Sequence, residues 1–135
     1  DKVILAGLEA TLRLYLQPEK LTETLPTLHL LTQSIDVLKE KAEQLKACLA
    51  NHLKDYDVEI EESFAQIGSG SQPMATIPSL AVTIAEKTEA KLTALLTVFK
   101  ALEQPIIGRV EKGKIWLDLR SVADFKALLD TVEKL

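Results

Sequence analysis

The sequence predicts an α/β domain of the α+β kind, with a mainly antiparallel sheet, helices on one face of it, and a long helical hairpin before it. Three observations carry this prediction. Apolar residues recur every three or four positions between residues 5 and 53, as they do in amphipathic helices. Apolar and polar residues alternate in several segments after residue 55, as they do in strands. The 135 residues are enough to bury one core, so we expect a single domain.

Two helices are predicted at the beginning of the chain. The first starts almost at residue 1 and ends before Pro18, because proline cannot continue the hydrogen-bond ladder. Since this helix starts so abruptly, we expect the chain to be cut from a longer protein. The second starts near Pro26 and extends to about Leu53, and its apolar seam favours packing along the first. The first stripe consists of Leu5, Leu8, Leu12 and Tyr15, and the second seam of Leu28, Leu31, Ile35, Leu38, Ala42, Leu45 and Leu49.

Strands are predicted after residue 55. Residues 56–61 alternate between apolar and acidic side chains, which indicates an edge strand. Residues 67–79 contain glycines and prolines that predict an irregular loop, and residues 80–84 alternate again as a second strand. A helix is predicted over residues 92–102, ending before Pro105.

Residues 106–110 and 115–119 are predicted to form a hairpin in which Gly113 supplies the positive φ of a tight turn. A two-residue loop pairs Val110 with Ile115, Gly108 with Leu117 and Ile106 with Leu119 on one face, and it leaves Ile107, Arg109, Trp116 and Asp118 on the other. The second face is too polar for an ordinary core. A tryptophan beside an arginine is typical of a surface that meets a partner or ligand.

The last predicted helix is capped by Ser121 and has Asp124 in its first turn. Its apolar stripe consists of Phe125, Leu128, Leu129, Val132 and Leu135. This helix completes the layer that we expect to cover one face of the sheet.

The composition narrows the classes of function. A net charge of −4 disfavours autonomous binding of nucleic acid, which needs a basic surface. The sequence has neither a leader peptide pattern nor an apolar run long enough to span a bilayer, so we expect a cytoplasmic protein without membrane contact. Cys48, His29 and His52 are too few for a structural zinc site, and we predict no metal.

Two features are candidates for binding an anionic group. The loop that contains Ser69, Gly70 and Ser71 can present backbone N–H groups and hydroxyls to a phosphate, although it lacks the Walker pattern and a plain connection is the simpler interpretation. Arg109 and Arg120 can clamp an oxyanion, and an ion pair with Asp118 is an equally good interpretation for them.

No complete catalytic group is predicted. His29 and His52 have no nucleophile or carboxylate at a catalytic spacing, and Cys48 lies beside the apolar seam of the long helix. The carboxylates of Glu59, Glu61 and Glu62 have the pattern of a solvated strand edge. We therefore expect that the active site, if there is one, needs residues that this chain lacks.

Three segments resemble the C-terminal part of the bacterial L-seryl-tRNA(Sec) selenium transferases, the selenocysteine synthases. They are residues 8–16 (LEATLRLYL) with residues 18–20 (PEK) and 25–27 (LPT); residues 66–71 (QIGSGS) with Pro73 and Leu80; and residues 105–109 (PIIGR) with Gly113 and residues 116–120 (WLDLR). In order and spacing these segments cover most of the chain.

The resemblance implies a pyridoxal-phosphate enzyme of the aspartate-aminotransferase fold type (fold type I). Residues 1–135 would be its single C-terminal small domain, with a helical linker and long helix over residues 1–53 and the sheet and helices over residues 54–135. The large domain that binds the cofactor would be absent. The resemblance implies that the cofactor-binding lysine lies in that domain, upstream of Asp1. Lys112 and Lys114 of this chain belong to an exposed hairpin turn. The fragment alone would therefore be inactive and would bind no cofactor.

The implied reaction converts seryl-tRNA(Sec) to selenocysteyl-tRNA(Sec) with selenophosphate, through a dehydroalanyl intermediate. The implied partners are the large domain, the other subunits of a homo-oligomer that is decameric in the family, and tRNA(Sec). The candidate substrate-binding residues are Arg109 first, and then Ser69, Gly70, Ser71 and Arg120.

Two alternatives remain open at this point. The runner-up within the same fold type is a small domain of a paralogous pyridoxal-phosphate lyase that acts on a small amino acid or sugar amine. A different class is a stand-alone interaction module that uses the surface around Trp116.

Overall fold

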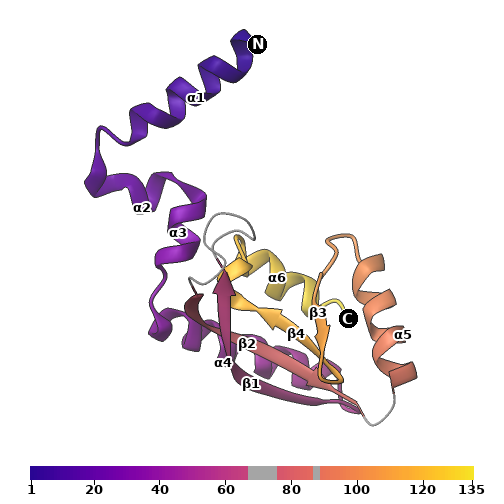
Figure 1. Cartoon of the computed structure of the whole chain (residues 1–135). Helices are drawn as coiled ribbons and strands as arrows, with labels where there is room; N and C mark the ends of the chain where they lie inside the picture. The colour runs from indigo at the N-terminus through magenta and orange to yellow at the C-terminus, as the bar shows by residue number, and fades with distance from the viewer. Residues whose placement is uncertain (67–75, 87–88) are drawn as a thin grey trace. The chain divides into compact units, whose positions relative to one another are not determined.

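The computed structural model describes residues 1–66, 76–86 and 89–135 (Figure 1). The chain divides into two compact units, Asp1–Gln33 and Ser34–Leu135. The first unit is entirely helical, and the second contains the sheet. Because the positions of the two units relative to each other are not determined, each unit is described by itself.

The first unit consists of four short helices: α1 (Lys2–Leu14), η1 (Pro18–Lys20), α2 (Leu21–Thr24) and α3 (Pro26–Thr32). Asp1 caps α1, because its carboxylate accepts a hydrogen bond of 3.2 Å from the Val3 amide. Proline starts both η1 and α3, where its missing N–H group costs nothing. None of these four helices contains a buried residue.

The predicted long helix from Pro26 to Leu53 is wrong, because the structure breaks it between α3 and α4 (Ile35–His52). Gln33 leaves the helical conformation with ψ at 133°, and the Ser34 hydroxyl then caps α4 by accepting a hydrogen bond of 3.3 Å from the Val37 amide. The buried side of α4 packs against the sheet; it consists of Leu38, Ala42, Leu45 and Leu49. The predicted packing of the first helix along the second stays a prediction, because it concerns the two separate units.

The second unit contains a four-stranded antiparallel sheet in the order β1-β2-β4-β3 (Figure 1). The strands are β1 (Asp57–Gln66), β2 (Thr76–Ala85), β3 (Arg109–Glu111) and β4 (Lys114–Asp118). The α+β class and the edge position of β1 are thereby confirmed.

One face of the sheet carries the core. Side chains of Val82 and Ile84 from β2, and of Ile115 and Leu117 from β4, pack with α4, α5 (Glu89–Ala101) and α6 (Phe125–Val132). Phe99 of α5 is fully buried in this cluster. The expected layer of helices on one face is thus confirmed.

Within the parts of the chain that the structure covers, no helix combines the length and the apolarity required to cross a membrane.

The hairpin of β3 and β4 has the predicted pairing of Val110 with Ile115. Its turn is formed by Lys112 and Gly113, which both have positive φ values of 52° and 71° and thus match the right-handed twist of the strands. The predicted pairing of Ile106 with Leu119 is wrong, since the Ile106 amide donates to the Phe99 carbonyl over 3.0 Å. Val110 is exposed and does not enter the core.

Gly108 precedes β3 at a point of close approach. A Cβ atom on this residue would lie 2.7 Å from Cγ2 of Ile115 and 3.1 Å from the Trp116 carbonyl oxygen. The backbone can pass so close to β4 only because glycine has no side chain.

Pro78 lies in β2, although the sequence predicted an irregular loop up to residue 79. It pairs with Phe64 of β1, and β4 pairs with β2 only from Ala81 onward. The Pro78 carbonyl accepts a hydrogen bond of 2.7 Å from the Arg120 guanidinium, so its missing N–H points to a side where the β4 ladder has already ended.

The start of the last helix also differs from the prediction. Asp124, and not Ser121, caps α6 by accepting a hydrogen bond of 2.9 Å from the Ala127 amide. Ser121 belongs to a separate turn, η2 (Leu119–Ser121), and its hydroxyl donates to the Asp118 carbonyl over 2.7 Å. The Ser121 hydroxyl, which the sequence predicted as the cap of the last helix, therefore stabilises the turn η2 that follows β4.

Candidate functional site

The sheet face opposite the core carries the candidate site, which we call the polar face. Successive side chains of a strand point to opposite faces, so the residues between the core positions share this side. Strand pairing aligns Thr83 with Trp116 and Trp116 with Arg109, in one row across three strands. The polar face comprises Glu59, Glu61, Ser63, Ser79, Thr83, Arg109, Lys114, Trp116 and Asp118.

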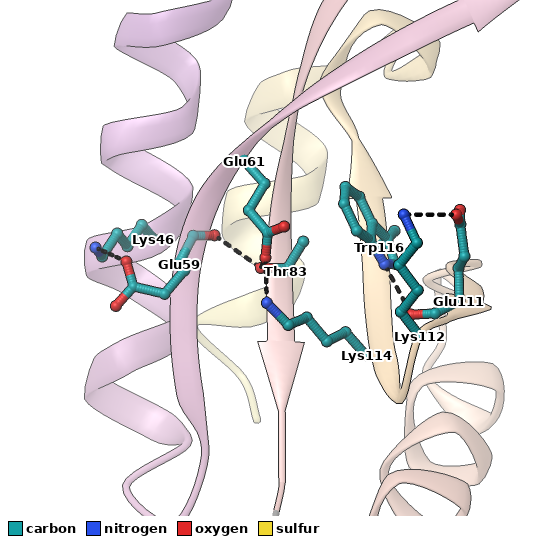
Figure 2. A network of polar contacts seen from close by, with 8 residues as sticks. All are labelled: Lys46, Glu59, Glu61, Thr83, Glu111, Lys112, Lys114 and Trp116. Atoms are coloured by element: carbon teal, nitrogen blue, oxygen red, sulfur yellow. Dashed lines mark hydrogen bonds and ion pairs between the residues drawn. The ribbon is translucent and has the colours of Figure 1, made fainter.

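Glu61 is the centre of one cluster on this face (Figure 2). Its Oε1 atom accepts hydrogen bonds from Lys114 Nζ over 2.5 Å and from Thr83 Oγ1 over 2.8 Å. These bonds, with that from Lys114 the larger cause, hold the pKa of the Glu61 carboxyl below its ordinary value of 4.5. Glu61 therefore stays ionised at neutral pH and joins β1, β2 and β4, which is a bracing role and not that of a general acid.

Asp118 is the centre of a second cluster. Its carboxylate accepts hydrogen bonds from the hydroxyls of Ser63 and Ser79, the latter over 2.7 Å, and from the Arg120 amide over 3.0 Å. Three hydrogen bonds hold this carboxylate in place. It links the end of β4 to β1 and β2.

Arg109 and Trp116 form the third feature of the polar face. The Arg109 guanidinium lies over the Trp116 ring, 5.0 Å from its centre, and its Nε atom is 3.5 Å from a carboxylate oxygen of Glu111. The Trp116 indole donates to the Glu111 carbonyl over 3.0 Å, so the ring is fixed in plane (Figure 2). Trp116 is buried, whereas the Arg109 side chain is 47% exposed. This arrangement presents an oriented guanidinium at the surface, which suits recognition of an anion.

The structure does not bring the two predicted arginines into one clamp. Arg109 lies on the β3 side of β4, whereas Arg120 follows β4 in η2 and reaches Pro78 on the β2 side. Arg120 is buried, and its guanidinium supports the end of β2. The predicted ion pair of Arg109 with Asp118 is wrong, because Arg109 pairs with Glu111.

Ser69, Gly70 and Ser71 lie outside the described residues. They belong to the segment that joins the paired ends of β1 and β2, at Gln66 and Thr76.

The other candidate groups form no catalytic arrangement among the described residues. Burial, and secondly the charge of Glu133, raises the pKa of the Cys48 thiol, which disfavours the nucleophilic thiolate. The His29 ring contacts the Thr22 carbonyl, with 3.2 Å between Nδ1 and the oxygen. In the described parts of the chain, no three His, Cys, Asp or Glu side chains are grouped as metal ligands.

Sequence reasoning missed the two clusters of the polar face. Glu61 was predicted at a solvated edge and Lys114 in an exposed turn, yet they bond to each other across β2. The period of two places Glu61 and Ser63 on the same face, but only the order of the strands shows that Lys114 and Asp118 are opposite them. That order is not a local property of the sequence.

The fold and the site define the class of protein as a small α+β domain with a closed core and a polar, hydrogen-bonded face that carries one half-exposed arginine. Comparison with known families assigns it further. A family model described as L-seryl-tRNA selenium transferase matches residues 1–123, and the chain belongs to this family.

Curated relatives agree with the family model. Proteins named L-seryl-tRNA(Sec) selenium transferase are 67% identical to this chain in Haemophilus influenzae strain Rd and in Pasteurella multocida, over 136 residues and 100% of the chain. A relative of the same name in Actinobacillus pleuropneumoniae serotype 5b is 54% identical over 99% of the chain. The chain spans about 30% of the length of these relatives.

Proposed function

We propose that this chain is the C-terminal small domain of an enzyme that converts seryl-tRNA(Sec) to selenocysteyl-tRNA(Sec) with selenophosphate. The observation that carries the proposal is the 67% identity to selenium transferases across 100% of the chain. A match of this extent includes the core, the polar face and the connecting turns alike. The proposal therefore concerns the whole longer enzyme, of which this chain supplies one part.

The cofactor of this enzyme is proposed to be pyridoxal phosphate, which supplies an electron sink for chemistry at the carbon beside an amine. Its site requires a lysine amine next to a phosphate-binding loop. The described residues of the polar face do not fit this group, because Lys114, the lysine of this face, is held by Glu61. Lys46 of α4 is likewise held by Glu59 at 3.0 Å. The cofactor would then be bound by residues outside this chain.

The role proposed for the polar face is to form one wall of a site that the rest of the enzyme completes. Arg109 is the best candidate to contact an anionic group, because stacking on Trp116 orients its guanidinium while half of the side chain stays exposed. Ser69, Gly70 and Ser71 remain candidates for the same task. Arg120 is a weaker one, because it is buried against Pro78.

The proposed partners follow from the same assignment. They are the large domain of the same polypeptide, further subunits of a homo-oligomer, and tRNA(Sec), which the name of the relatives contains. The net charge of −4 favours tRNA contacts outside this chain. The proposed place of action is the cytoplasm.

The test uses a chimera of the Haemophilus influenzae relative in which this chain replaces the matched residues. We expect the purified chimera to convert seryl-tRNA(Sec) with selenophosphate at a rate within about tenfold of the unmodified relative. The readout is selenium incorporated into acid-precipitable tRNA. A folded chimera with bound cofactor that transfers no selenium would contradict the proposal.

Arg109→Ala in the chimera tests the proposed anion contact. We expect KM to rise about 10-fold or more for the substrate whose anionic group Arg109 contacts, seryl-tRNA(Sec) or selenophosphate. A charge-assisted hydrogen bond contributes about 1.5–3 kcal/mol. Arg109→Lys should recover part of the loss, since it keeps the charge but not the planar fork. Lys112→Ala is the matched control, as it removes an exposed charge from the adjacent turn. Equal kinetic effects of Arg109→Ala and Lys112→Ala would show that Arg109 has no specific role.

A further inference from the structure

Helix α1 carries an apolar stripe along one side. It consists of Leu5, Leu8 and Leu12 and continues just past the end of the helix to Leu16; we call these four residues the leucine stripe, and their side chains are 53% to 79% exposed. They line a shallow groove of about 550 Å³ together with Glu9 and Arg13. Spacings of three and four residues place Leu5, Leu8 and Leu12 on one face of the helix.

The first unit offers no cover for this stripe. Its helices α1, η1, α2 and α3 contain no buried residue, so the unit has no core of its own. An isolated helix of 13 residues is marginally stable in water, and most helices depend on packing of their apolar face. The leucine stripe therefore needs a partner surface for α1 to be well ordered.

A second copy of α1 is a poor partner. Sustained pairing of helices needs about three to four heptads, whereas the 13 residues of α1 form fewer than two. The second unit is also a poor match. Its described large apolar side chains that remain exposed are spread over separate elements: Ile35 and Val37 at the start of α4, Phe64 on β1, Val98 on α5, and Ile107 and Val110 near β3.

The length of the relatives points to the remaining candidate. This chain matches about 30% of each relative, so most of the polypeptide lies outside these residues. The ion pair of Glu9 and Arg13, with 2.7 Å between its atoms, flanks the stripe and stays well exposed, which suits the polar rim of a docked helix.

We propose that the leucine stripe of α1 docks lengthwise into an apolar groove on the part of the enzyme outside these 135 residues, with Glu9 and Arg13 at the rim of the contact. The inference rests on the proposed function only in that the chain is one part of a longer enzyme. It assigns α1 the role of the anchor that holds the small domain to that enzyme.

Amide hydrogen exchange tests the proposal in the chimera defined above and in the 135-residue chain alone. We expect the α1 amides to exchange on the order of 100-fold more slowly in the chimera, because burial of two or more leucines stabilises the helix by several factors of ten. In the chain alone they should exchange close to the rate of an unfolded peptide. Amides of β1 and β2 should be protected in both.

A matched pair of variants gives the stripe its own test. Leu8→Glu with Leu12→Glu should remove the protection of α1 in the chimera while β1 and β2 stay protected. Ala10→Glu introduces the same side chain on the opposite side of α1 and should leave the protection in place. Leucine and glutamate have similar helix propensities, so loss in the double variant alone reports on the contact.

Other outcomes overturn the proposal. If α1 is protected in the chain alone at every protein concentration, the leucine stripe contacts the second unit. If that protection rises with protein concentration, the leucine stripe contacts a second copy of the chain. If α1 is unprotected in a chimera that transfers selenium, the docking proposal is contradicted and the proposed function stands. Protected α1 that is lost in the double variant, in a chimera that transfers no selenium, would support the docking and contradict the proposed function.

Discussion

The two faces of the sheet are stabilised in different ways. The core face is covered by α4, α5 and α6 and excludes polar side chains, with Ile84, Ile115 and Phe99 fully buried. The polar face has two carboxylates, Glu61 and Asp118, that hydroxyl, amine and amide groups surround. One face thus depends on buried area and the other on directed bonds.

This difference bears on function. The core face is covered by helices, whereas the polar face keeps some charged side chains partly exposed, although Ser79, Thr83 and Trp116 on it are buried. Arg109 is the clearest case, because its stacking partner Trp116 is buried and its own side chain is half exposed. The polar face is therefore the side of the sheet for which we propose contact with a substrate or with the rest of the enzyme.

The largest effect is expected on the core face. Phe99→Ala should lower the free energy of unfolding by about 3–5 kcal/mol, because it removes a fully buried ring and leaves a cavity. Urea unfolding followed by circular dichroism measures the change. Val98→Ala on the same helix, at a side chain 49% exposed, is the control and should change stability much less. Similar losses in the two variants would show that α5 does not pack as described.

An intermediate effect is expected at the Asp118 cluster. Asp118→Ala should lower the free energy of unfolding by about 1–3 kcal/mol, because the Ser63 and Ser79 hydroxyls and the Arg120 amide lose their acceptor. Thermal unfolding of both proteins measures the loss. Asp130→Ala, at an exposed position on α6, removes the same charge and should be nearly neutral. An Asp118→Ala variant as stable as the Asp130→Ala control would contradict the cluster.

The smallest effect is expected at Glu61, and it should depend on pH. The pKa of Glu61 is lowered in the folded state, so its contribution is present above the ordinary value of 4.5 and is lost as the pH falls through the lower folded value. Glu61→Gln should therefore reduce stability at pH 7 by less than about 1 kcal/mol, since the pair is partly exposed. The difference from the unmodified chain should shrink below pH 4.5.

Urea unfolding at a series of pH values measures this difference. Glu62→Gln, one residue further along β1 and exposed, is the control for the loss of a charge. A constant difference between Glu61→Gln and the unmodified chain from pH 7 to pH 3 would show that the ion pair with Lys114 contributes nothing.

Local patterns of the sequence were sufficient for most elements of the second unit. Alternation located β1 and β2, and Gly113 located the turn that sets the pairing of Val110 with Ile115. The same patterns failed at the break after Gln33, because the apolar spacing continues from α3 into α4 and hides the cap at Ser34. The Ser34 hydroxyl caps α4 there through a single hydrogen bond, which the apolar spacing does not reveal.

The candidate site was predicted only in part. Arg109 and Trp116 were placed together correctly, because they are opposite each other in one hairpin. The bond between Glu61 and Lys114 depends on β4 lying next to β2, with α5 between them in the chain. Pairing between distant segments follows from packing of the whole core, and short-range spacing does not reveal it.

The strand order β1-β2-β4-β3 also affects how fast the different strand pairs form during folding. The β3–β4 hairpin closes over Lys112 and Gly113 and should form in about 1–10 μs. Joining β2 to β4 requires Ala85 and Lys114 to meet across the segment that includes α5, and the entropy lost in closing a loop grows with its length. We therefore expect the pairing of β2 with β4 to limit the refolding rate. A loop insertion between β2 and β3 should slow refolding more than an insertion of the same length in the turn between β3 and β4 slows closure of the hairpin.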